Sequence, residues 1–243
     1  MKRKILLISL VIVLIGGVGY GYYQKATYKL ERPIVSMEIK DYGTIKIELY
    51  PDMAPNTVKN FIKLINEGYY NGLTFHRVEE NLIQGGDTAG DGSGQTELSI
   101  NGEFAKNGYD NTLKFERGTL GLARLDYTYY SSMDVSLTEE GYNSGYAQFF
   151  IMTQDATEFD GYYCSFGKVI EGIEIVDEIT KLETEVKTDE ETGEKNETTK
   201  PVNPPVISNI KVDTFGVDYG EPKTHGTFDI NSWFMSYYYG LSY

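Results

Sequence analysis

The sequence predicts a mostly β domain in which a closed antiparallel barrel carries two helices. The first observation is strict alternation of apolar and polar residues in 35–40 and 43–49, joined by a turn at 41–43, which is typical of an antiparallel hairpin. The second is the order of the elements: hairpin, helix, many short β-like segments, helix and a last strand at 206–215. Helices that stand outside one curled antiparallel sheet give this order.

The first helix is expected within residues 52–66, where the apolar spacing changes from two residues to that of a helix. Val58, Phe61, Ile62 and Ile65 fall on one face. Asn56 or Thr57 is the expected cap, and Glu67-Gly68 ends the helix. Short β-like segments broken by glycine and asparagine follow as far as Val169, and the second helix is expected at 173–182.

Two segments lie outside this frame. Residues 183–205 are dense in Glu, Lys and Thr, which predicts a solvated excursion or a hairpin rather than a second domain. The last 26 residues, 218–243, form an unusually aromatic tail. Two interpretations of the tail stay open: it packs back onto the barrel, or it contacts a partner or a membrane surface.

The amino terminus predicts export. Lys2-Arg3-Lys4 precedes twenty uncharged residues, 5–24, which as a helix would cover about 30 Å, the thickness of a hydrocarbon core. The basic residues predict a cytoplasmic N-terminus and a domain outside the cytoplasm. We therefore expect a single-pass signal anchor at 1–24 in the cell membrane, a tether at 25–32 and a folded domain at 33–217 before the tail. The alternative is a cleaved signal peptide and a secreted protein.

Composition excludes several classes of function. The chain has 243 residues and a net charge of −14, which repels nucleic-acid phosphates, so no nucleic-acid partner is expected. One cysteine, Cys164, excludes an internal disulfide and a cysteine-based zinc site. The two histidines, His76 and His225, are too far apart in sequence to indicate a metal site. We expect a monomer that needs no metal or cofactor.

Three ordered motifs carry the chemistry. The first is Phe75-His76-Arg77-Val78 followed by Gln84-Gly85-Gly86-Asp87. The second joins 118–124 to Ala147-Gln148-Phe149-Phe150-Ile151, and the third runs from Phe159-Asp160-Gly161 to 166–172. Together they resemble the signature of the cyclophilins, the peptidyl-prolyl cis-trans isomerases, including bacterial exported members. The resemblance covers roughly residues 35–217 and implies the eight-stranded barrel of that family.

The resemblance also implies a site and a substrate class, proline-containing polypeptides. Arg77 would be the catalytic arginine, and Gln84 would position both Arg77 and the substrate backbone. Phe150 would form the base of a proline pocket. The other positions expected around it are pocket walls at Leu82, Phe159 and Tyr163 and groove residues at Ala123, Arg124 and Gln148. His76, next to Arg77 on a strand, should face the other way and have a structural role.

The sequence departs from the family pattern at several points. The spacing from Arg77 to Gln84 is one residue shorter than usual, Asn81 replaces a common Phe, and Glu158 replaces a Trp found in many eukaryotic members. Residues 125–147 between Arg124 and Gln148 number 23, where family members usually have about ten, and we expect the tyrosines and carboxylates of this insertion to lie beside the cleft. The resemblance predicts a foldase for exported proteins. Alternatives are a non-catalytic chaperone that holds Pro-containing segments, and a surface interaction module that uses the tail.

Overall fold

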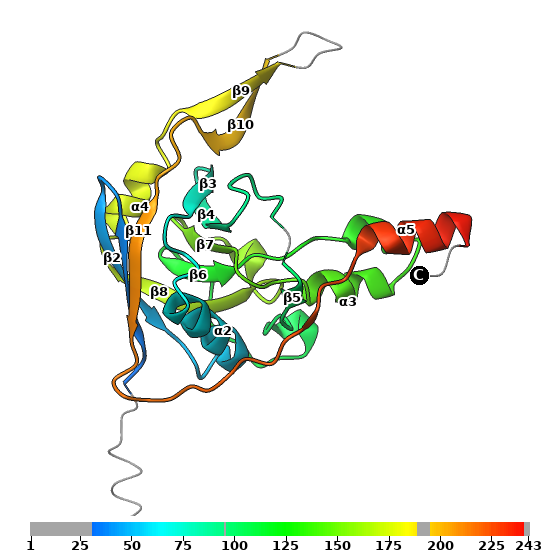
Figure 1. Ribbon diagram of the computed structural model, residues 1–243, viewed down its shortest axis with the longest axis horizontal. Helices are drawn as coiled ribbons and strands as arrows, with labels where there is room; N and C mark the ends of the chain where they lie inside the picture. Colours follow the sequence, from blue (N-terminus) through cyan, green and yellow to red (C-terminus); the bar gives the residue numbers. More distant parts are fainter. Residues whose placement is uncertain (1–30, 95, 189–194, 241–243) are drawn as a thin grey trace, which may run out of the picture. The chain divides into compact units, whose positions relative to one another are not determined.

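An eight-stranded antiparallel sheet forms the frame of the domain in the computed structural model, which describes residues 31–94, 96–188 and 195–240 (Figure 1). The strands stand in the order β11-β1-β2-β8-β6-β7-β4-β3. Their bounds are β1 Ile34–Ile39, β2 Gly43–Leu49, β3 Thr74–Val78, β4 Leu82–Asp87, β6 Thr119–Leu122, β7 Phe149–Met152, β8 Cys164–Glu171 and β11 Ile207–Asp213. The predicted hairpin is the β1–β2 pair, in which Ile34 lies opposite Glu48.

The sheet is strongly curled but not closed, so the prediction of a closed barrel was wrong. The edge strands β3 and β11 meet only at one end, where the Gly72 amide donates to the Ile207 carbonyl at 2.8 Å and Phe75 donates to Pro205 at 2.9 Å. Prolines precede β11 at positions 204 and 205. Because proline has no N–H group, these residues cannot extend a ladder between the two edges.

The described residues contain four α-helices, not the two that were predicted. The two predicted helices are α2 (Pro55–Asn66) and α4 (Ile173–Ile179). The others are α3 (Ser136–Tyr142), within the insertion, and α5 (Ile230–Tyr239), within the tail. Both lie outside the barrel motifs on which the prediction of two helices was based. Short 3₁₀ turns occur at Ala105–Asn107, Thr128–Tyr130 and Thr157–Phe159.

The start of α2 is stabilised from a distance. Neither Asn56 nor Thr57 acts as the cap, because Ala54 occupies the N-cap position without a side-chain hydrogen bond. Instead the buried carboxylate of Glu103 accepts hydrogen bonds from the backbone amides of Asn56 (3.0 Å) and Thr57 (2.8 Å) and from the Thr57 hydroxyl (2.8 Å). A negative charge at a helix N-terminus satisfies otherwise unpaired N–H groups and complements the helix dipole.

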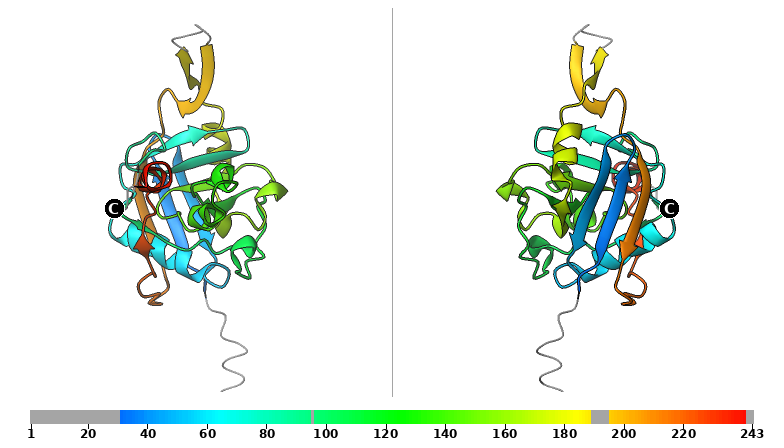
Figure 2. Two further views of the ribbon diagram at one scale, coloured as in Figure 1. Left: turned by 90° about the vertical axis from the view of Figure 1, so that its right-hand side faces the viewer. Right: turned by 90° about the vertical axis from the view of Figure 1, so that its left-hand side faces the viewer.

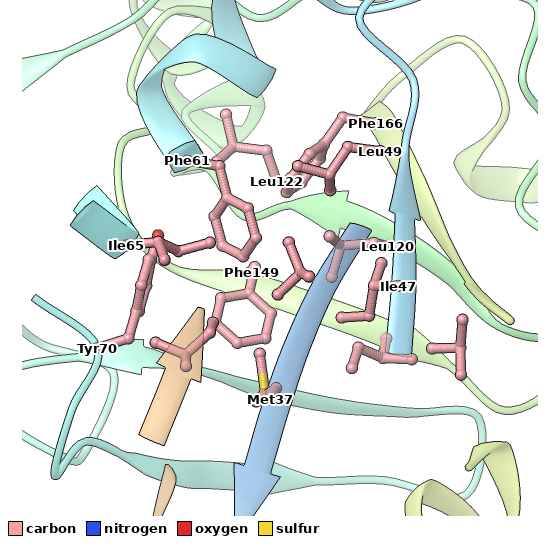
Figure 3. Close-up of a cluster of buried hydrophobic side chains, with 14 of the residues drawn as sticks. Met37, Ile47, Leu49, Phe61, Ile65, Tyr70, Leu120, Leu122, Phe149 and Phe166 are labelled. Atoms are coloured by element: carbon pink, nitrogen blue, oxygen red, sulfur yellow. The ribbon is translucent and has the colours of Figure 1, made fainter. Parts of the chain in front are cut away.

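The hydrophobic core lies between α2 and the concave face of the sheet (Figure 3). Alternation along β1 and β2 directs one apolar set inward, and α2 contributes the other. The Phe61 ring of α2 stands 5.6 Å from the Phe149 ring and 5.2 Å from the Phe166 ring in edge-on contacts. Such contacts add to the free energy of apolar burial. Phe149 therefore belongs to the core. Because successive side chains of a strand point to opposite faces, its neighbour Phe150 lies on the other face of β7.

The remaining strands lie outside the eight-stranded sheet. The strands β9 (Thr184–Thr188) and β10 (Lys195–Pro201) pair antiparallel with each other, and the pair extends beyond the sheet in both views of Figure 2. Of the two alternatives predicted for the polar segment 183–205, a solvated excursion or a hairpin, the antiparallel pair agrees with the hairpin.

The tail contacts the domain at successive points. Asn56 on α2 exchanges two hydrogen bonds with the Lys223 backbone, at 2.9 and 2.7 Å. Next, β12 (His225–Gly226) pairs with β5 (Leu98–Ser99). The tail then reaches the insertion, where the Phe234 ring of α5 lies 5.1 Å from the Tyr130 ring. The structure therefore shows the tail packed against the domain.

The predicted membrane segment at 1–24 lies outside the described residues. Among the helices that the structure does describe, none has both the length and the apolar character required to cross a bilayer.

Candidate active site

Four residues on adjacent strands form a row across the sheet. Arg77 on β3 pairs with Gln84 on β4, Gln84 pairs with Phe150 on β7, and Phe150 pairs with Gly121 on β6. Cross-strand partners lie on the same face of a sheet, so this register brings residues from the first and second sequence motifs together. The row lies on the face opposite the core.

The Arg77 guanidinium is held at one end of this row. Its Nη1 donates to the Gln84 Oε1 at 2.9 Å, and its Nε donates to the Glu79 Oε1 at 2.8 Å. Gln84 in turn donates through Nε2 to the Gln148 Oε1 at 2.9 Å. The 40% exposure of the Arg77 side chain leaves part of a rigid, permanently charged donor open to a ligand.

A cluster of apolar side chains adjoins this polar chain on its Phe150 side. The Phe150 ring stacks on Phe115 with centroids 5.6 Å apart, and lies 5.8 Å from each of the Phe159 and Tyr163 rings. Leu82 and Ala123 pack in the same cluster. The predicted pocket residues are therefore brought together, as a wall of aromatic and aliphatic groups beside a fixed cation.

Sequence reasoning missed three members of this cluster, Phe115, Met152 and Ala156. Strand alternation could have identified Met152, because it stands two residues after Phe150 on β7. Nothing local marks Phe115, which precedes β6 and reaches the pocket through tertiary packing. Gly121 makes room for both rings, since a Cβ there would lie 2.3 Å from the Phe150 Cζ and 2.8 Å from the Phe115 Cε1.

Gln148 connects the row to a glycine-rich loop. Its Nε2 donates to the Asp87 Oδ1 and to the Gly92 carbonyl, both at 3.3 Å. The other Asp87 oxygen accepts from the backbone amides of Asp91 (3.1 Å) and Gly92 (2.9 Å). The buried Asp87 carboxylate therefore organises this loop. Within the described residues, no group of three or more His, Cys, Asp or Glu side chains is placed to hold a metal ion.

Arg124 is the predicted groove residue that turns away from the row. Its Nε donates to the Tyr162 carbonyl at 3.1 Å and its Nη1 to the Leu125 carbonyl at 2.9 Å. The guanidinium also lies 4.5 Å from the centroid of the Tyr163 ring. Arg124 thus joins the base of the insertion to the Tyr163 side of the cluster.

His76 is buried, and the register between β3 and β4 shifts between Phe75 and Arg77, so strand alternation does not assign the side on which His76 lies. Within the described part of the chain neither ring nitrogen has a hydrogen-bond partner, and burial lowers the pKa of the ring. Of the two departures from the family pattern near the pocket, Asn81 is partly buried and Glu158 is exposed.

Comparisons with known proteins agree with this geometry. The sequence model of the family described as "Cyclophilin type peptidyl-prolyl cis-trans isomerase/CLD" matches residues 34–212. The chain is 37% identical over 137 residues to peptidyl-prolyl cis-trans isomerase B of Bacillus subtilis, a match covering 56% of this chain and 82% of that protein. It is 32% identical over 161 residues to peptidyl-prolyl cis-trans isomerase-like 2 of Rhizopus delemar, covering 65% of this chain but only 27% of that longer relative.

A solved structure shares the fold. The cyclophilin type peptidyl-prolyl cis-trans isomerase of Cryptosporidium parvum, crystallised in the presence of the dipeptide Ala-Pro, aligns with a TM-score of 0.56 and 27% sequence identity. The alignment covers 74% of this chain and 98% of that one. From the ordered motifs, the curled sheet and the family match, the chain belongs to the cyclophilin-type peptidyl-prolyl cis-trans isomerase family.

Proposed function

We propose that this protein isomerises X–Pro peptide bonds in exported polypeptides, with Arg77 as the catalytic donor. The observation that carries the proposal is the row Arg77–Gln84–Phe150, in which a partly exposed guanidinium lies on the same face of the sheet as the aromatic cluster around Phe150. A proline ring in the Phe150 pocket would place its own amide bond toward Gln84 and Arg77.

The chemistry needs no nucleophile or cofactor. An X–Pro amide isomerises over tens to hundreds of seconds because its partial double bond must be broken by twisting. Bringing this to milliseconds requires a gain of about 10⁴- to 10⁵-fold, or about 5.5–7 kcal/mol. As the amide twists, its nitrogen becomes pyramidal and gains a lone pair. A donor fixed by Glu79 and Gln84 can stabilise that geometry more than either planar form.

Each side chain has its own task in this proposal. Phe150 forms the pocket floor, and Leu82, Phe159 and Tyr163 form the walls with Ala123 beside them. Gln84 positions the guanidinium, and it would also accept a hydrogen bond from the substrate backbone or donate one to it. Gln148 fixes Gln84 through the 2.9 Å hydrogen bond between them. Arg124 holds the Tyr163 wall and the base of the insertion. The Ala-Pro dipeptide present with the Cryptosporidium parvum relative supports a proline-containing ligand.

The deciding experiment is an exchange-NMR isomerase assay on the compact unit Arg32–Tyr243 with Ala-Pro-containing peptides. We expect wild-type turnover, and a fall of about 30- to 1000-fold for Arg77→Ala, equal to about 2–4 kcal/mol of transition-state stabilisation. Arg77→Lys should restore little, because a point charge lacks the planar fork. Peptide binding without catalysis in the wild type would instead support the alternative of a non-catalytic chaperone.

We also propose that residues 1–24 anchor the protein in the cell membrane with the domain outside the cytoplasm. Support comes from the twenty uncharged residues 5–24 behind three basic ones. Cell fractionation should leave the full-length chain in the membrane fraction after a high-salt wash, since apolar burial is not screened by salt. A shortened soluble chain that starts near residue 20 would show a cleaved signal peptide instead.

A further inference from the structure

A cavity adjoins the candidate active site on the Gln148 side. It encloses about 370 Å³ and shares Gln84, Gln148 and Ala123 with the row and the proline pocket. We name it the flanking pocket and define it by Asp87, Tyr127, Tyr146, Gln148, Phe228 and Asp229. Since it opens beside Gln148, a chain whose proline occupied the Phe150 pocket would pass its neighbouring residue over this cavity.

Three parts of the sequence that lie far apart build the flanking pocket. Asp87 and Gln148 belong to the barrel, Tyr127 and Tyr146 to the ends of the insertion, and 227–230 to the tail. In Figure 1 the tail passes from β11 to α5, which lies beside α3 of the insertion. The cavity therefore depends on the insertion and the tail as well as on the barrel.

The tail wall is held in place by specific contacts. The Thr227 amide donates to the Glu97 carbonyl at 3.1 Å, and its hydroxyl lies 2.9 Å from the Ser99 hydroxyl. The next residue, Phe228, places its ring 6.0 Å from that of the buried Tyr127. Asp229 then caps α5 by accepting from the Asn231 amide at 2.9 Å. The tail and the insertion thus form one continuous wall.

The chemistry of the wall favours a cation. The lining residues include two carboxylates, Asp87 and Asp229, and a single basic residue, Arg124. Two of the guanidinium nitrogens of Arg124 already donate to the Tyr162 and Leu125 carbonyls. The lining also contains the aromatic residues Tyr69, Tyr127, Tyr146 and Phe228. Aromatic faces and carboxylates together attract an ammonium or guanidinium group, and the net charge of −14 adds a long-range attraction.

We propose that the flanking pocket binds a lysine or arginine side chain next to the substrate proline, so that the tail forms part of the substrate-binding surface. The proposal rests on the proposed isomerase function, whose groove supplies the proline. It gives the insertion and the tail one joint role, the choice among X–Pro sites by the charge beside them.

The experiment compares peptides that carry Lys, Arg, Ala or Glu on either side of a single proline, using the unit Arg32–Tyr243. Turnover is measured by exchange NMR and the dissociation constant by amide shift titration. We expect the Lys and Arg peptides to exceed the Glu peptide by about fivefold to tenfold in kcat/KM, and to bind more tightly by a similar factor. Asp229→Asn removes the charge but keeps a good helix cap, and should reduce this preference by about threefold.

Phe228→Ala should reduce the same preference by removing a ring from the wall. The matched control is Phe234→Ala, which removes an α5 contact with Tyr130 but no lining side chain. It should keep the wild-type preference. Equal preferences for Lys and Glu peptides, or a preference unchanged in both Asp229→Asn and Phe228→Ala, would overturn the proposal. If no peptide were turned over, the isomerase proposal would fail, and the dissociation constants would still decide the role of the flanking pocket.

Discussion

The Arg77 guanidinium lies against the carboxylate of Glu79, two residues further along the chain, which accepts from its Nε at 2.8 Å and also from its Nη2. Gln84 occupies Nη1 on the other side. The donor of the proposed reaction is therefore oriented by a local acid as well as by the neighbouring strand. A planar fork fixed at both ends presents its remaining N–H groups in one direction.

Glu79→Gln is expected to lower kcat/KM by about threefold to tenfold, because about 1 kcal/mol of positioning is lost. Glu79→Ala should lower it further. The matched control is Glu80→Gln, an equal charge change at an exposed neighbour, which should leave turnover unchanged. A similar loss in Glu80→Gln would show that net charge, and not the position of the guanidinium, is responsible. The measurement is exchange NMR on an Ala-Pro peptide.

Gly121→Ala is expected to weaken both folding and peptide binding. The added Cβ would meet the Phe150 ring at 2.3 Å, so the ring must move and the proline pocket changes shape. We expect a loss of about 1–3 kcal/mol in the free energy of unfolding and a higher KM. Gly226→Ala is the control, because a Cβ there has no atom within 4 Å. Chemical denaturation of both variants checks the prediction, and an unchanged KM in Gly121→Ala would contradict the assignment of Phe150.

Acidification from pH 7 to pH 5 is expected to destabilise the domain through His76. Burial lowers the pKa of this ring in the folded state, whereas the unfolded chain has a value near 6.5. As the pH falls through 6.5, the unfolded state therefore takes up a proton before the folded state does, and the free energy of unfolding decreases. Stability is fully retained above this range.

His76→Gln should flatten this dependence, as measured by urea denaturation at intervals between pH 5 and pH 7.5. His225→Gln, at the exposed second histidine, should keep the wild-type slope. A wild-type slope in His76→Gln would assign the effect to other groups.

Glu103→Gln is expected to reduce the free energy of unfolding by about 2–4 kcal/mol, because the buried carboxylate accepts three hydrogen bonds at the start of α2. An amide cannot accept from all three donors without turning its own NH₂ group toward one of them. Glu116→Gln disrupts an exposed pair with Lys168 and should cost about 0–1 kcal/mol. Thermal or urea unfolding distinguishes the two, and equal losses would contradict this account of the α2 cap.

The local patterns of the sequence were sufficient for much of this structure. Alternation located β1 and β2, helical spacing located α2, and the order of three motifs indicated the family. Those signals are readable because period, turn chemistry and motif spacing are encoded in neighbouring residues. The resemblance to the family, carried by the motifs, implied Arg77, Gln84 and Phe150 as site residues, and the strand register places them in one row.

Tertiary structure alone decided the rest, because it depends on contacts between distant residues. Glu103 caps α2 across 46 residues of sequence, and Phe115 reaches Phe150 from outside any motif. The two sheet edges, β3 and β11, meet only at one end, so the barrel stays open. The tail meets the insertion through Phe228 and Tyr127, about 100 residues apart, and together they enclose a cavity. Periodicity describes one segment at a time, whereas each of these features exists only where two segments meet.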